Sequence, residues 1–196
     1  MGVWTGDALA FNVGAFAGTS FCLWFGVRDL AVPDYIERWR RGAEGEKWTA
    51  KELCKLGPDW RVRHDLQGRY GNVDHVVVGP AGVFLLDSKA WFNGVTSINA
   101  DGPVVTPRHD AESSWHWSGL PGRMRGAAAG ASGGLRAMCG RRLKVTPVVV
   151  IWGEFPGRVQ ERGGVTYVEG EHVRKWLLGL PHRLSPEDNA ALARLY

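Results

Sequence analysis

The sequence predicts a mixed α/β fold in which a central β-sheet lies between helices. Two patterns lead to this prediction. Apolar or small residues recur every three or four positions over 34–56, which is the period of an amphipathic helix. Short apolar runs rich in β-branched and aromatic residues follow as candidate strands. The predicted order, α-β-β-β-α-β-β-α-α, is typical of helices packed against a sheet.

Turn signals and periodicity place the individual elements. Gly57-Pro58 ends the first helix, and Pro80-Ala81 followed by Gly82 predicts a tight turn between two strands. Strands are predicted at 60–66, 73–79, 82–90, 145–152 and 165–168, with a sheet extension at 95–106. Further helices are predicted at 122–139, 171–178 and 186–195, and a loop at 107–118.

Composition excludes several classes of protein. With 196 residues, 44% of them hydrophobic and 22% charged, the chain can bury a real core and is neither disordered nor fibrous. Its three cysteines, Cys22, Cys54 and Cys139, lie far apart and form no C-x-x-C motif. This argues against a disulfide framework and a cysteine-based zinc site, and favours a reducing compartment. The net charge of +4 permits an anionic partner.

The amino-terminal segment raises a membrane question. Residues 8–27 carry no charge, and this stretch is long enough to cross a bilayer as a helix, although its glycines and polar residues weigh against that. Basic residues follow the stretch and none precedes it, so a spanning helix would leave the rest in the cytoplasm. A buried or disordered leader is the alternative. We therefore divide the chain into a hydrophobic leader, 1–33, and a domain, 34–196, that is cytoplasmic or anchored at the cytoplasmic membrane face.

Two aspartates are predicted to face each other across the hairpin centred on Pro80-Ala81. A symmetric turn puts Asp74 directly opposite Asp87, and like charges at such positions destabilise a strand pair. Both carboxylates end apolar strand runs, where ionised groups are costly unless they are paired or metal-bound. Hard oxygen donors suit Mg²⁺ or Mn²⁺. Lys89 lies two residues after Asp87, so strand alternation predicts it on the same face.

The first helix offers one more acid. Glu46 falls near the centre of the predicted apolar stripe, whereas Glu37, Glu44 and Glu52 fall on the far side. A buried carboxylate needs a partner. A salt bridge is the simpler explanation, and the alternative is that Glu46 joins Asp74 and Asp87 at one cation.

Three short segments that contain these acidic residues resemble a known protein family. Gly42-Ala43-Glu44-Gly45-Glu46, Gly71-Asn72-Val73-Asp74-His75 and Gly82 to Lys89 (GVFLLDSK) together resemble the NERD (nuclease-related) domain, over about residues 34–152. That family is similar to the PD-(D/E)xK restriction-endonuclease superfamily.

The resemblance implies a restriction-endonuclease-like core and a metal-dependent nuclease that hydrolyses phosphodiester bonds, of DNA in preference to RNA. It implies catalytic roles for Glu46, Asp74, Asp87 and Lys89. It also implies a Mg²⁺ or Mn²⁺ site made by Glu46, Asp74, Asp87 and the carbonyl of Ser88. A bound metal would activate water and neutralise charge on the phosphate, with Lys89 orienting the water.

A basic, acid-free stretch supplies candidate nucleic-acid contacts. No acidic residue occurs between Glu112 and Glu154. The candidate phosphate-binding residues in it are Arg123, Arg125, Arg136, Arg141 and Arg142. A solvated basic surface is the alternative reading.

Two further observations leave the activity open. Related nucleases often carry Gln or Tyr on the helix after the core strands, and 122–139 contains neither. This favours a second hypothesis, a non-catalytic nucleic-acid-binding module on a nuclease fold. Trp115-His116-Trp117 could stack on bases, although such aromatics more often pack in the protein.

Overall fold

The computed structural model describes residues 34–68, 71–140 and 143–195. The chain divides into two compact units, residues 1–40 and 41–196, and the sheet and the site described below lie in the second unit. The predicted leader, with its uncharged stretch at 8–27, falls outside the described residues, as do Arg141 and Arg142. Among the helices of the described part, none is both long and apolar enough to cross a membrane.

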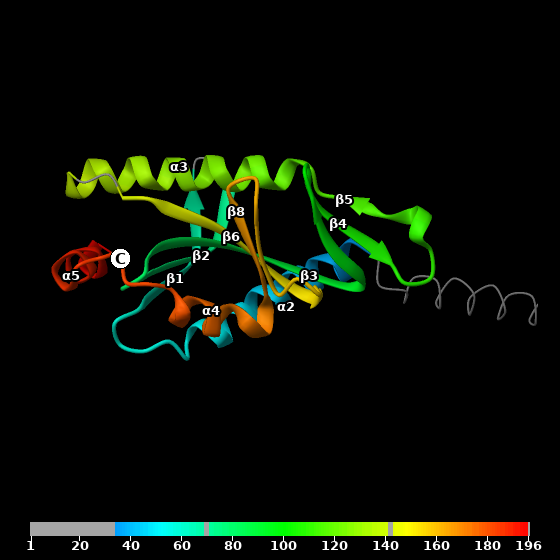
Figure 1. The fold of residues 1–196 in the computed structure, drawn as a ribbon, viewed down its shortest axis with the longest axis horizontal. Coiled ribbons are helices and arrows are strands. Elements are labelled where there is room, and N and C mark those ends of the chain that lie inside the picture. Colours follow the sequence, from blue (N-terminus) through cyan, green and yellow to red (C-terminus); the bar gives the residue numbers. More distant parts are fainter. Residues whose placement is uncertain (1–33, 69–70, 141–142, 196) are drawn as a thin grey trace, which may run out of the picture. The chain divides into compact units, whose positions relative to one another are not determined.

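The order of elements confirms the mixed α/β prediction (Figure 1). The helices are α2 (Asp34–Leu53), η1 (Ala111–Ser113), α3 (Gly119–Cys139), η2 (Gly170–His172), α4 (Val173–Gly179) and α5 (Pro186–Leu195). The strands are β1 (Arg61–Gly68), β2 (Gly71–Gly79), β3 (Gly82–Asn99), β4 (Gly102–Pro107), β5 (Trp115–His116), β6 (Val145–Glu154), β7 (Val159–Arg162) and β8 (Val165–Glu169).

The strands of the described residues form one eight-stranded mixed sheet. Its main path runs β1-β2-β3-β6-β8-β7, and β4 pairs with both β3 and β5. The β3–β6 and β6–β8 pairs are parallel, and the hairpin pairs are antiparallel. The parallel β3–β6 pair is possible because the connection between these strands contains α3, which packs on the sheet.

Each face of the sheet carries its own apolar core, because neighbouring residues of a strand point to opposite sides. On the α3 face, Leu120 and Met124 pack with Val76 and Leu85. On the other face, here called the α2 face, Leu53 of α2 and Leu177 of α4 pack with Val77 and Leu86. Figure 1 shows α3 along one side of the sheet and α2 with α4 along the other.

The main differences between the predicted elements and the structure concern β3, β5 and β7. β3 runs without interruption from Gly82 to Asn99 and includes the first part of the predicted extension, and β4 forms the rest. The predicted loop 107–118 contains the two-residue strand β5, and β7 was not predicted at all. Strands this short give too few residues for an alternating pattern to be recognised.

The hydroxyl group of Thr49 links α2 to the sheet through hydrogen bonds. Thr49 is fully buried and its Oγ1 donates to the Gly45 carbonyl at 3.0 Å. The same oxygen accepts hydrogen bonds from Ser88 Oγ on β3 and from Trp152 Nε1 on β6, both at 2.8 Å. One donor and two acceptor positions are all that a hydroxyl offers, so its hydrogen-bonding capacity is fully used.

Replacing Thr49 by valine is expected to lower the free energy of unfolding by about 2 kcal/mol, because Ser88 and Trp152 both lose their acceptor. Urea denaturation of the purified chain measures this. Thr49→Ser keeps the hydroxyl and is the matched control, with an expected loss below about 1 kcal/mol. Equal losses in the two variants would show that the hydroxyl contributes nothing.

Candidate active site

The pairing of β2 with β3 brings the two predicted aspartates together. The antiparallel ladder runs from Gly79↔Gly82, at the turn, to His75↔Leu86. Asp74 and Asp87 are the next residues on each strand, immediately beyond that last pair. The symmetric register predicted for this hairpin is therefore confirmed.

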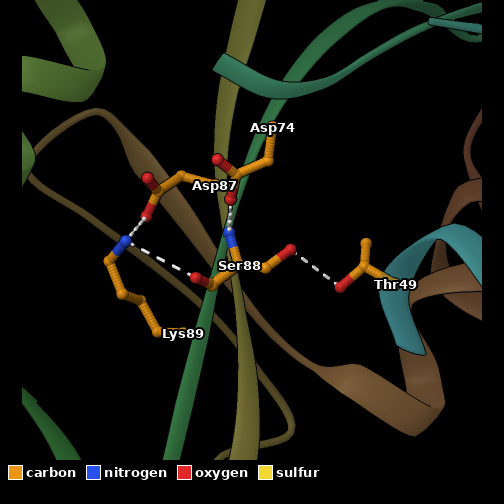
Figure 2. A network of polar contacts seen from close by, with 5 residues as sticks. All are labelled: Thr49, Asp74, Asp87, Ser88 and Lys89. Carbon is orange, nitrogen blue, oxygen red and sulfur yellow. Dashed lines mark hydrogen bonds and ion pairs between the residues drawn. The ribbon is translucent and has the colours of Figure 1, made fainter. Parts of the chain in front are cut away.

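The carboxylate of Asp74 binds the main chain of β3. Its Oδ2 accepts a hydrogen bond of 2.6 Å from the Ser88 N–H, as Figure 2 shows. Burial and, second to it, the neighbouring charge of Asp87 together raise the pKa of Asp74 to about 7. The Ser88 amide and Lys89 act in the opposite direction without restoring the ordinary value. The site thus holds more negative charge than its own cation compensates.

Lys89 is the cation of this cluster. Its Nζ lies 2.6 Å from Asp87 Oδ2 and 3.4 Å from the Ser88 carbonyl oxygen (Figure 2). The side chains of Lys89 and Asp87 are 20% and 17% exposed, so the ion pair is partly shielded yet open to a ligand. The pair also confirms that the two side chains share one face of β3.

Ser88 connects this cluster to the opposite face. Its N–H holds Asp74, while its side chain points the other way and donates to Thr49 of α2. Figure 2 shows Thr49 and the Asp87–Lys89 pair on opposite sides of Ser88. Thr49 was not singled out from the sequence, although a lone hydroxyl on an apolar helix stripe was an available signal.

Glu46 lies near the cluster but approaches from the α2 face. It is half-buried, and burial raises its pKa, as do the charges of Asp65 and Asp87, while Lys89 lowers it. The pKa of Glu46 therefore depends on the charges of Asp87 and Lys89. Glu46 belongs to α2, which packs on the face to which the Ser88 side chain points. In residues 34–68, 71–140 and 143–195, no three His, Cys, Asp or Glu side chains come close enough to hold a metal ion. A cation shared by Glu46, Asp74 and Asp87 stays a prediction.

The predicted arginines have different surroundings. Arg123 of α3 lines a small cavity of about 70 Å³ that Asp87 and Asn72 also line. Arg125 donates from Nη1 to the Gly163 carbonyl at 2.6 Å, in the turn between β7 and β8. Arg136 is exposed near the end of α3. Of the described arginines in this set, Arg123 is the one placed beside the acid pair.

Replacing Asp74 by asparagine is expected to stabilise the metal-free protein by roughly 1–3 kcal/mol at about pH 8. Because the folded protein holds the pKa of Asp74 at about 7, above its ordinary value, wild-type stability falls as the pH rises from about 4 to 7. Asparagine can still accept the Ser88 hydrogen bond but carries no charge.

Urea unfolding in the presence of a chelator measures this effect. The stabilisation should shrink towards about pH 4, where both side chains are neutral. A variant no more stable than wild type at the higher pH would contradict the charge imbalance.

Comparison with known proteins identifies one family for the segment that contains this cluster. Residues 41–115 match the family model described as the nuclease-related domain, NERD. The matched segment includes Glu46, Asp74, Asp87 and Lys89. No curated protein and no solved structure matches the chain. The family prediction made from the sequence is confirmed: residues 41–115 form a nuclease-related domain, which is a PD-(D/E)xK-like nuclease domain.

Proposed function

We propose that this protein is a metal-dependent nuclease that hydrolyses phosphodiester bonds of DNA, with its active site at Asp74, Asp87 and Lys89. One observation carries the proposal. Two carboxylates end a strand ladder side by side, with a lysine ion-paired to one of them, and burial together with the charge of Asp87 raises the pKa of Asp74 to about 7. Uncompensated carboxylate charge in a partly open cluster is typical of a cation-binding site.

The donors at this position fit Mg²⁺ or Mn²⁺. Asp74, Asp87 and the carbonyl of Ser88 supply hard oxygen atoms, and Glu46 of α2 would add a further carboxylate. These residues would hold the ion. A bound divalent ion supplies an activated water and neutralises charge on the phosphate.

The chain's own residues supply positioning. The Lys89 ammonium is held between Asp87 and the Ser88 carbonyl, where it can orient the attacking water and stabilise negative charge on the phosphate oxygens. Arg123, which lines a small cavity together with Asp87, can bind a phosphate through its guanidinium. Neither role requires movement of the strands.

Replacing Asp87 by asparagine is expected to reduce Mg²⁺-dependent DNA cleavage by about a hundredfold or more, because the variant loses an anionic donor and the partner of Lys89. Conversion of supercoiled plasmid and shortening of labelled single-stranded DNA measure this. Glu171→Gln, at an exposed position on η2, is the control and should cleave like wild type. Unchanged cleavage in Asp87→Asn would overturn the proposal.

Metal binding is expected to raise the melting temperature of the wild type, because a ligand that binds only the folded state stabilises it. The rise should be larger at about pH 8 than at about pH 6, since protonation of Asp74, whose pKa is about 7, competes with the metal. Scanning calorimetry with Mn²⁺ measures this. Asp87→Asn should show little rise, and an equal rise in both proteins would place the metal elsewhere.

A second candidate is a nucleic-acid-binding module without catalysis. It is favoured by the ion pair that occupies Asp87 and by the absence, across the described residues, of three metal-ligating side chains in one group. Under this alternative, the protein binds DNA in a salt-dependent manner and shows no metal-dependent cleavage.

A further inference from the structure

Aromatic side chains gather where β3 leaves the proposed active site. The β3–β6 pairing is regular from Asp87↔Val149 to Trp91↔Gly153, so residues of β3 alternate faces throughout. Trp91 therefore lies on the face of Asp87 and Lys89, and its packing in the core of the α3 face agrees with this. Trp91 follows Asp87 by about 13 Å along the strand.

Trp91 supports a second, more exposed indole. The rings of Trp91 and Trp117 lie 5.3 Å apart at an interplanar angle of 37°. Trp117 is 37% exposed, and Trp115, on β5, is 49% exposed. We call these three residues the tryptophan platform. Large exposed aromatic surfaces of this kind mark binding sites more often than single scattered apolar residues do.

The main chain holds the platform firmly. The Trp117 N–H donates to the Pro103 carbonyl at 2.9 Å, and the Trp117 carbonyl accepts from the Leu120 N–H at 3.0 Å. Leu120 itself lines the small cavity beside Asp87 and Arg123. The platform is thus attached to the wall of the proposed active site and loses little entropy when a ligand binds.

The acid-free, basic sequence that contains the exposed tryptophans favours an anionic ligand. The sequence from Ser113 to Gly153, which contains Trp115 and Trp117, has no acidic residue, and Arg123 lies one helical turn beyond Leu120. Exposed aromatic faces beside cations suit unpaired nucleotides, because every base offers a π-face for stacking while the phosphates meet the basic residues. A paired duplex hides those faces within its own stack.

We propose that the tryptophan platform stacks the bases of an unpaired strand, so that the substrate class is single-stranded DNA or the frayed end of a duplex. The inference rests on the proposed nuclease function for the location of the cleaved bond. Base stacking itself requires neither metal nor cleavage.

Fluorescence anisotropy with the full-length protein, in a chelator and at low salt, tests this inference. The probes are a labelled oligothymidylate, an abasic oligonucleotide of equal length and a blunt duplex. Trp117→Ala is expected to weaken oligothymidylate binding by about tenfold while leaving abasic binding unchanged. Trp117→Phe should retain most of the affinity.

Phe92→Ala is the matched control. Phe92 is 45% exposed on the same strand, but it packs against Trp48 of α2 and so lies on the opposite face. It should bind oligothymidylate like wild type. Equal binding by Trp117→Ala and wild type would overturn the platform, as would equal losses on all three probes, which indicate a folding defect or a surface for protein partners.

These experiments distinguish failure of the proposed nuclease function from failure of the tryptophan platform. If Trp117 governs oligothymidylate binding but no metal supports cleavage, the proposed nuclease function fails and the platform stands. If the wild type cleaves DNA and Trp117→Ala binds and cleaves single strands equally well, the platform fails and the nuclease function stands.

Discussion

The register of the β2–β3 hairpin is the constraint on which the candidate site depends. The two-residue turn at Pro80-Ala81 leaves one pairing in which the apolar residues of both strands reach the two cores. That pairing carries Asp74 and Asp87 to the same point at its open end. A slip by one residue would separate them, but it would also turn every buried valine of β2 towards the wrong face. The packing energy of the core therefore holds two like charges beside each other.

Local pattern was sufficient to predict this part of the structure. Turn chemistry gave the register, and strand alternation placed Lys89 beside Asp87, because both follow from rules with a period of two residues. The helix α2 was predicted from its apolar period, and its observed end at Leu53 is close to the predicted stop at Gly57-Pro58. Such features depend on neighbours in the chain, which a single sequence contains in full.

Features that depend on which face a helix covers could not be predicted. Glu46 was predicted near the packed side of α2, but the apolar period does not state whether that helix lies on the Asp87 or the Ser88 side of β3. The same limit applies to Arg125, whose partner Gly163 is distant in sequence. Similarly, Trp91 lies outside the strand predicted at 82–90, and its contact with Trp117 joins two distant parts of the sequence. Long-range contacts of this kind follow from the assembled sheet.

Ser88 links the acidity of Asp74, on one face of the sheet, to the helix α2 on the other face. Its amide hydrogen lowers the pKa of Asp74, and its hydroxyl is fixed by Thr49. Glu46 of α2 also raises the pKa of Asp74, so the proton affinity of this carboxyl group depends on a helix that packs on the other side of the sheet. Loosening α2 would remove the Glu46 charge while the β3–β6 ladder kept the Ser88 peptide group in place, and Asp74 would become a stronger acid. Titration of one aspartate would then report the docking of a helix.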